Sequence, residues 1–372
     1  MLNLYISGSS TLGYSVHGLN MLKAFIENGT DTNITLIGQI NIDQYYNKFL
    51  EAISSSVFDK NCPSLHIFHS NYSNQALGSP LVNFAVFETT QLQAMEFHHL
   101  QHTVDLIFTT TEDHKALIEE NGITTPVHVI HEGADPKLYN TEPCTKYIDT
   151  GKFTYITAGK NELRKNTDTV IKAYIETSQL KDTALIAHTF DPFYQGKDLP
   201  WTNLKLENYG YKGVEENKKY LKFSNGVSDI YLTKYGIPVS SMKSLYRSAN
   251  VGIFFSKAEG WNLGLMECMA CGIPTIASNV IGHKEYLKDA PTVQKNLIIE
   301  PTGLEIADDG KWFKGDRGSW ATLNKSDLYD LIEDVYESKE DYETPNNTLS
   351  TYYHNNFNWH IPAKKVRDIL SV

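Results

Sequence analysis

The sequence predicts an α/β fold made of two doubly wound parallel sheets. Short β-rich runs alternate with amphipathic helical patterns from one end of the chain to the other, which is typical of βαβ units. The runs are continuously apolar rather than alternating, as expected for strands covered by helices on both faces. At about 100–200 residues per domain, the length of 372 residues indicates two such domains, each able to bury its own core.

The first series of expected strands precedes a polar, aperiodic stretch at residues 140–152, which we interpret as a linker. A helical pattern with Leu19, Leu22 and Phe25 on one face follows the first strand. The expected strands of this series are 3–7, 34–38, 65–69, 83–88, 105–111 and 127–133.

The second series of strands restarts after the linker, so a second sandwich of the same kind is expected. Helical patterns dominate from about Lys325, and Pro362 is expected to precede a last helix over residues 363–370. The expected strands here are 153–159, 184–190, 229–236, 251–256, 274–278 and 296–301.

Composition excludes several classes of protein. The 33 Lys and Arg residues against 44 Asp and Glu give a net charge of −11, which argues against a broad basic surface for nucleic acid. The longest apolar runs fall far short of the roughly 18–20 residues that cross a bilayer, so no stable membrane insertion is expected. Four scattered cysteines make no disulfide framework, and the N-terminus has no basic leader, so we expect a cytoplasmic protein.

The most informative segment follows the expected strand 251–256. In open α/β sheets, ligands bind beyond the carboxyl ends of strands, and this strand leads directly to Glu259. A glycine-containing turn and a helix rich in Leu and Met come next, with Glu267 on the first turns of that helix. Taken alone, both carboxylates could equally be solvated or helix-capping groups. Three backbone amides at the helix start suit a phosphate: those of Asn262, Leu263 and Gly264.

The stretch EGWNLGLMECMACGIPTIAS, residues 259–278, resembles the Glu-x7-Glu signature of retaining glycosyltransferases with the GT-B fold, in particular family 4. The resemblance implies that Glu259 contacts the transferred sugar, Glu267 holds the ribose hydroxyls of the nucleotide, and the amides of residues 262–264 bind the diphosphate. The pair Cys268 and Cys271 has metal-ligand spacing, but it falls inside the motif helix and is interpreted as packing.

The same resemblance implies two Rossmann-like domains that face each other across a cleft. Residues 1–145, joined by the C-terminal helix at 355–372, would bind the acceptor, and residues 150–350 would bind the nucleotide sugar. The two domains would close over the donor, with residues 140–152 as the hinge.

Cations are expected at the end of the strand 153–159, in a segment that resembles the Arg-Lys segment of the same family. Arg164 and Lys165 would stabilise the departing diphosphate. Because the chain has no Asp-x-Asp pair, we expect these cations to act without a metal and without any cofactor beyond the donor sugar. The alternative is an exposed charge cluster at a helix start.

Further candidates come from the first series. The loop at residues 8–14 resembles the family's N-terminal glycine loop, with Gly13 as the donor contact and Tyr14 beside it. Glu88 ends the strand 83–88, where acceptor binding, base catalysis and a structural ion pair with a lysine all remain open. Downstream, residues 278–287 resemble the family's Gly-Gly-x-x-Glu loop, with Gly282 and Glu285 at the matching places.

These patterns together predict a retaining glycosyltransferase that moves a sugar from a UDP- or GDP-sugar to a hydroxyl acceptor. The alternatives are a phosphorylase or epimerase on the same fold, and a catalytically silent protein that binds sugar or nucleotide. The sequence specifies neither the base nor the acceptor, which could be a glycan, a lipid, a metabolite, a protein or a modified nucleic acid.

Overall fold

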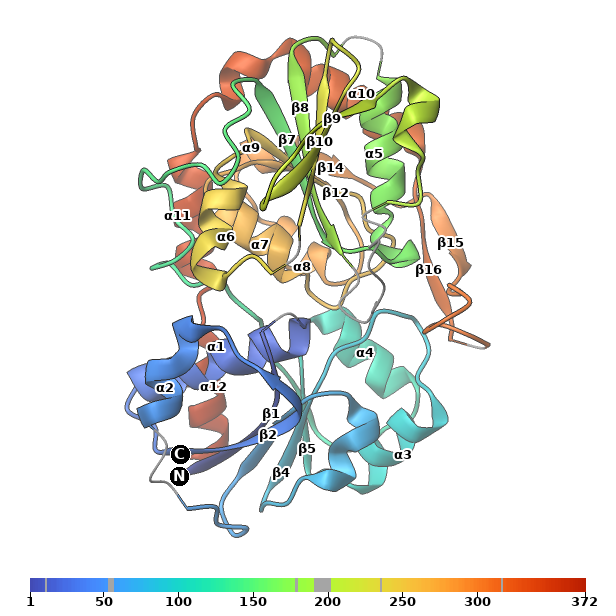
Figure 1. Ribbon diagram of the computed structural model, residues 1–372. Coiled ribbons are helices and arrows are strands. Elements are labelled where there is room, and N and C mark those ends of the chain that lie inside the picture. Colours follow the sequence, from blue (N-terminus) through green and yellow to red (C-terminus); the bar gives the residue numbers. More distant parts are fainter. Residues whose placement is uncertain (11, 53–56, 178–179, 191–201, 235, 316) are drawn as a thin grey trace.

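The computed structural model describes residues 1–372 except 11, 53–56, 178–179, 191–201, 235 and 316. It contains two α/β halves (Figure 1). The N-terminal half comprises residues 1–139 together with the last helix, and the C-terminal half comprises residues 153–356. Two expected positions, Thr11 in the glycine loop and Tyr235 in a strand, lie outside the described residues.

The first sheet confirms the six expected strands, all parallel, in the order β2-β1-β3-β4-β5-β6. Leu4 and Ile6 of the first strand, which lies between β2 and β3, are fully buried, as the continuous apolar runs predict. Gly18 allows close packing of the first helix, because a Cβ there would overlap the side chain of Ile6. The strands are β1 (Leu2–Ser9), β2 (Thr32–Asn41), β3 (Ser64–Ile67), β4 (Leu81–Ala85), β5 (Leu106–Thr109) and β6 (Val127–Val129).

The second sheet has the order β14-β13-β12-β7-β8-β11-β10-β9. The sheet is parallel, as expected, except at one edge, where β10 pairs antiparallel with both β9 and β11. Sequence reasoning missed this hairpin because β9, KGVEE, is exposed along its whole length and has no apolar run. The strands are β7 (Phe153–Lys160), β8 (Thr183–Phe190), β9 (Lys212–Glu216), β10 (Tyr220–Ser224), β11 (Asp229–Thr233), β12 (Val251–Phe254), β13 (Thr275–Ser278) and β14 (Ile298–Ile299).

Helices flank both sheets, and a separate hairpin, β15 (Gly303–Ile306) and β16 (Ser319–Thr322), projects from the C-terminal half (Figure 1). The helices are α1 (Gly13–Glu27), α2 (Asn47–Ala52), α3 (Ala94–His102), α4 (Glu112–Glu120), α5 (Thr167–Glu176), α6 (Val239–Tyr246), α7 (Leu263–Ala270), α8 (His283–Leu287), α9 (Thr292–Lys295), α10 (Lys325–Glu337), α11 (Asn347–Asn356) and α12 (His360–Leu370). None of the helices within the described ranges combines the length and apolar character of a membrane span.

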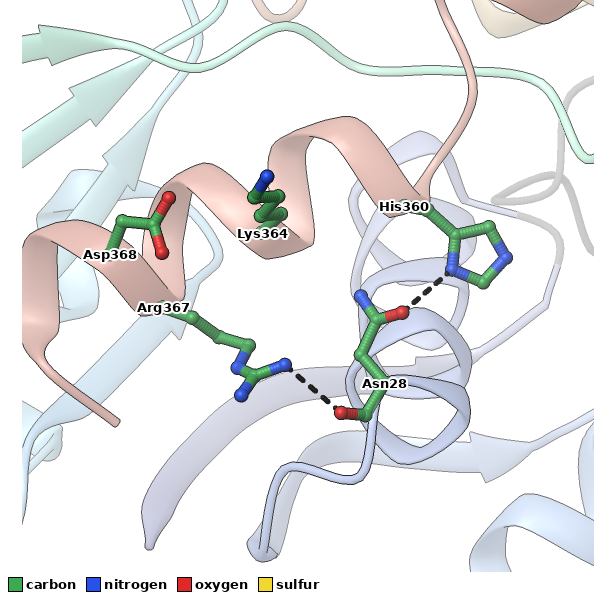
Figure 2. A pocket seen from close by; sticks show the side chains of 5 residues that line it. All are labelled: Asn28, His360, Lys364, Arg367 and Asp368. Atoms are coloured by element: carbon green, nitrogen blue, oxygen red, sulfur yellow. Dashed lines mark hydrogen bonds between the residues drawn. The ribbon is translucent and has the colours of Figure 1, made fainter.

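The last helix, α12, packs against α1 in the N-terminal half. It begins three residues before the expected start, because Pro362 lies in its first turn, where the missing N–H removes no helical hydrogen bond. At a polar surface pocket of about 360 Å³, Arg367 donates to the carbonyl oxygen of Asn28 at 2.9 Å, and His360 lies 3.1 Å from the Asn28 side-chain oxygen (Figure 2). These bonds fasten the end of the chain to the N-terminal half.

Contacts between the two halves include several from the segments that follow β4, β5 and β12. The hydroxyl of Thr110 donates to the carbonyl oxygen of Gly260 at 2.8 Å. On the β15–β16 hairpin, the indole of Trp320 donates to the carbonyl oxygen of Glu88 at 2.9 Å. The N–H of Ser319 donates to the Thr90 hydroxyl at 2.8 Å. The hairpin therefore joins the C-terminal half to the segment that carries Glu88.

Candidate active site

Glu259 occupies the point where β12 gives way to the turn before α7. Strand β7 is the parallel neighbour of β12, so the segments that follow both strands meet at one edge of the sheet. Arg164 Nη1 lies 2.8 Å from the Glu259 carboxylate, and Lys165 Nζ also lies 2.8 Å from it. The Glu259 residue is only 2% exposed. The structure thus brings the three predicted catalytic residues into direct contact.

Two opposing effects act on the pKa of Glu259. Burial raises the pKa, because a desolvated carboxylate is costly, but the charges of Lys165 and Arg164 lower it more strongly. The net result holds the pKa of Glu259 well below its usual range. Glu259 is therefore a carboxylate at every pH at which the protein would be assayed.

Arg164 is the centre of a larger ion-pair cluster. Its Nη2 lies 2.8 Å from the carboxylate of Glu88, in the N-terminal half, and 2.9 Å from that of Glu162. Its Nη1 also donates to the carbonyl oxygen of Ala258 at 2.7 Å. Burial lowers the pKa of Arg164, but the surrounding carboxylates more than compensate, so it remains a cation. Glu88 thus forms an ion pair with an arginine, whereas the partner named among the three alternatives for this residue was a lysine.

The start of α7 lies beside this cluster. Asn262 precedes the helix with φ 74° and ψ 75°, a left-handed conformation that favours glycine or asparagine. Its side-chain oxygen accepts from the N–H of Leu265 at 3.4 Å, which caps the helix. Within the ranges that the structure describes, the N–H groups of Leu263 and Gly264 donate to no protein acceptor. The expected amide donors are therefore available at the helix start.

Glu267 has different surroundings from Glu259. It lies inside α7, is 7% exposed, and accepts a hydrogen bond from the hydroxyl of Tyr246 at 3.0 Å. Burial, with a smaller effect from the charges of Asp135 and Glu132, raises the pKa of Glu267 to about 7, although hydrogen bonds from tyrosine hydroxyls lower it. The structure therefore separates the two carboxylates of the motif into two environments.

The glycine loop reaches the site indirectly. The hydroxyl of Tyr14 donates to the carbonyl oxygen of Val86 at 3.1 Å. Val86 in turn lies against Gly260, where a Cβ would overlap the Val86 side chain. Gly13 is the first residue of α1, and open space surrounds the position of its missing Cβ. Tyr14 is thus connected to the Glu259 turn only through Val86. Gly13 is exposed and leaves room for a ligand.

Sequence reasoning missed two residues of this site, Glu162 and His283. His283 is fully buried, and its Nε2 lies 3.0 Å from the side-chain nitrogen of Asn262. Gly282 and Glu285 on either side of it were predicted from the resemblance, but a histidine at an unspecified position of a motif gives no signal of its own. Glu285 instead lies 3.4 Å from His131 of the N-terminal half. Glu162 lies only two residues before Arg164, so the sequence did contain a signal for its pairing with that arginine.

Comparisons with known proteins identify a similar family and a shared fold. Residues 178–308 match the family model described as Glycosyl transferases group 1. The O-antigen chain mannosyltransferase B of Escherichia coli is 31% identical over 97 residues, which are 26% of this chain and 24% of that protein's length. The matched segment therefore spans about a quarter of the curated relative.

Solved structures resemble the whole chain. Sucrose-phosphate synthase from Thermosynechococcus elongatus has a TM-score of 0.67 and 14% identity, covering 100% of this chain and 98% of its own. Anabaena HepE, solved in complex with UDP and glucose, has a TM-score of 0.68 and 12% identity, covering 100% and 99%. The chain has the GT-B fold, and its residues 178–308 are similar to the glycosyl transferases group 1 family.

Proposed function

We propose that this protein is a glycosyltransferase that moves a sugar, with retention of configuration, from a nucleotide-diphosphate sugar to a hydroxyl acceptor. The observation that carries the proposal is the buried Glu259 carboxylate, held ionised by Arg164 and Lys165 beside the start of α7. The family match supports sugar transfer. The UDP and glucose in the HepE structure and the mannosyltransferase activity named for the E. coli relative support a nucleotide-sugar donor.

In the proposed reaction, the acceptor oxygen forms a bond to the anomeric carbon as the bond from that carbon to the diphosphate oxygen breaks. The acceptor's proton passes to the departing diphosphate, so a nucleoside diphosphate leaves and no carboxylate forms a covalent bond. Attack and departure occur on the same face of the sugar, which retains the configuration. This differs from a glycosidase, in which two carboxyl groups flank the bond.

Each charged group of the site has a role in this step. Arg164, Lys165 and the amides of Leu263 and Gly264 take up the negative charge that develops on the diphosphate. Glu259 positions the sugar and offsets positive charge on its ring. Glu267 accepts hydrogen bonds from the ribose hydroxyls. The same cations remove the need for a metal, and the reaction needs no cofactor beyond the donor.

The two halves divide the substrates in this proposal. Residues 150–350 bind the donor, because they carry both motif carboxylates and the cations. Residues 1–145, with 355–372 packed against them, face the acceptor, and Glu88 is the acidic group of this half that reaches Arg164. Residues 140–152 connect the halves and would act as the hinge for closure over the donor.

Donor turnover tests the proposal. Purified protein is incubated with a panel of UDP- and GDP-sugars, with and without EDTA, and nucleoside diphosphate release is measured. At least one donor should be turned over at a rate that EDTA does not change. Glu259→Gln should lower the rate on the order of 10²–10³-fold, whereas Glu216→Gln on the exposed strand β9 should leave it unchanged.

Other outcomes would overturn the proposal. Nucleotide binding without turnover of any donor would indicate a silent binding protein. Turnover unaffected by Glu259→Gln would refute the site assignment. Once an acceptor is known, proton NMR of the product should show the anomeric configuration of the donor, and the opposite configuration would exclude retention.

A further inference from the structure

A chain of three buried side chains runs from His283 through Asn262 to Glu259. The side-chain nitrogen of Asn262 lies 3.0 Å from Nε2 of His283 and 3.4 Å from Oε1 of Glu259. All three residues are at most 8% exposed. Gly282 brings the two loops together, because a Cβ on it would overlap the carbonyl oxygen of Glu259. The loop that carries His283 is therefore packed directly on the Glu259 turn.

The hydrogen bonds fix the form of His283. Its Nδ1 lies 2.7 Å from the carbonyl oxygen of Ser278, which can only accept, so Nδ1 carries the proton. Burial lowers the pKa of His283 to about 4, against an opposing effect of Glu259, so the ring is neutral near pH 7. Its Nε2 must then accept a hydrogen bond, and Asn262 supplies the donor.

This acceptor determines which way the Asn262 amide points. The NH₂ group faces His283 and Glu259, and the amide oxygen faces the N–H of Leu265. Reversing the amide would place its oxygen against two acceptors, the His283 nitrogen and the Glu259 carboxylate, and would lose the helix cap. The backbone conformation alone would be satisfied by glycine, so the asparagine side chain serves a separate purpose.

We propose that His283 is a positioning residue that acts through Asn262 to hold the Glu259 carboxylate in its reactive orientation. This inference rests on the proposed function, in which Glu259 faces the transferred sugar. The Asn262 amide, held by His283, donates to the Glu259 carboxylate, and the two cations contact the same carboxylate from the segment after β7. Two separate loops therefore fix its position. A small displacement of such a group lowers the rate of the chemical step more than it lowers the affinity for the substrate.

A double-mutant cycle tests whether His283 acts through Asn262. His283→Ala and Asn262→Gly should each lower kcat by roughly 10- to 100-fold with the donor KM changed less than threefold. Glycine keeps the left-handed backbone at position 262, so this variant removes only the side chain. The double variant should be no slower than the slower single variant, because both remove the same contact. His283→Gln, whose amide oxygen can accept from Asn262, should recover part of kcat.

Two controls separate positioning from general damage. His128→Ala, on the edge strand β6, should leave kcat unchanged, and unfolding temperatures should be recorded for every variant. Multiplied losses in the double variant, or equal losses with His283→Gln and His283→Ala, would show a merely structural role. Unchanged kcat in either single variant would overturn the proposal.

A second measurement does not depend on turnover. Long-range ¹H–¹⁵N NMR of the histidine rings should show His283 with an unprotonated Nε2 from pH 5.5 to 8, and its Nε2 shift should move in Asn262→Gly. If the wild-type protein turns over no donor, the proposed function fails while this result still tests the His283–Asn262 bond. A protonated Nε2 in the wild-type protein would overturn the inference by itself.

Discussion

Glu259 and Glu267 belong to one strand–turn–helix segment, yet their surroundings have opposite electrostatic effects. Glu259 contacts two cations at 2.8 Å, which hold its pKa well below its usual range despite burial. Glu267 contacts the Tyr246 hydroxyl, and burial raises its pKa to about 7. One carboxylate is permanently charged, and the other titrates near neutral pH.

The difference suits two different ligand groups. A fixed charge beside two cations can respond to charge that develops during a reaction. A carboxylate surrounded by hydroxyl groups suits hydrogen bonds to neutral hydroxyls such as those of a ribose. The two ends of the motif therefore match the proposed division between the reacting sugar and the nucleotide.

The largest effect on stability is expected from removing Arg164, the cation that three carboxylates share. Arg164→Met leaves Glu88, Glu162 and Glu259 facing one another without their arginine. Breaking a buried ion pair from one side costs about 3–5 kcal/mol, so the unfolding temperature should fall by roughly 6–15 °C. Calorimetry at neutral pH measures this change. Lys234→Met, which breaks the exposed pair with Glu216, should shift the unfolding temperature by less than about 3 °C.

The pH dependence of this variant provides a sharper test. The lowered pKa values of Glu259 and Glu162 stabilise the wild-type protein above their unfolded pKa values of about 4.3, and this contribution is lost as the pH falls. Arg164→Met lacks that contribution, so its loss of stability relative to the wild type should be nearly constant from pH 7 to about 4.5 and should shrink as the pH falls below about 4. A loss of stability that does not shrink below about pH 4 would show that packing, rather than charge, is lost.

Replacing Glu267 should stabilise the folded protein, whereas Arg164→Met should destabilise it. The pKa of Glu267 is about 7 in the folded protein and about 4.3 in the unfolded chain, so its ionisation destabilises the fold as the pH rises through 7. Glu267→Gln should therefore be more stable than the wild type at pH 8, by roughly 3–4 kcal/mol, and nearly equal at pH 4. Unfolding temperatures across this pH range measure the difference.

The control for this prediction is Glu337→Gln, which removes an exposed carboxylate from α10 and should give a profile parallel to the wild type. Glu267→Gln should at the same time weaken nucleotide binding, since a neutral amide is a poorer acceptor for ribose hydroxyls. A Glu267→Gln profile that runs parallel to the wild type would mean that Glu267 does not titrate near neutral pH.

Most strands and the place of the site could be predicted from the sequence, for identifiable reasons. Apolar runs such as VGIFF report strands buried on both faces, and the chain order places the tips of β7 and β12 at one edge. That placement predicted that the segments carrying Arg164 and Glu259 lie at one site. The exposed hairpin β9–β10 could not be predicted this way, because its pairing depends on backbone hydrogen bonds rather than on apolar pattern.

The charges of the site were harder to predict than its location. Arg164 and Lys165 were expected to face a diphosphate, but in the structure both lie against Glu259. The pairing of Glu88 with Arg164 joins residues 76 positions apart, and the sequence gives no sign of which cation Glu88 meets. His283 was missed because its role depends on a tautomer fixed by the Ser278 carbonyl oxygen.

The smallest expected effect concerns the contact between the halves. Glu88 lies 2.8 Å from Arg164, and its side chain is 35% exposed. If Arg164 takes up the donor diphosphate, Glu88 competes with the phosphate for the same guanidinium. Glu88→Gln should then tighten UDP or GDP binding by roughly threefold, about 0.6 kcal/mol, because an exposed ion pair is worth little. Titration calorimetry measures this affinity.

The salt dependence of nucleotide affinity tests whether Glu88 competes with the phosphate for Arg164. The gain from Glu88→Gln should shrink in 0.5 M NaCl, because salt screens the partly exposed Glu88 charge in the wild type. Glu112→Gln, on the exposed start of α4 in the same half, should leave affinity unchanged at both salt concentrations. Weaker nucleotide binding in Glu88→Gln would instead mean that Glu88 holds Arg164 in place for the donor. The ion pair would then belong to the donor site and would not compete with it.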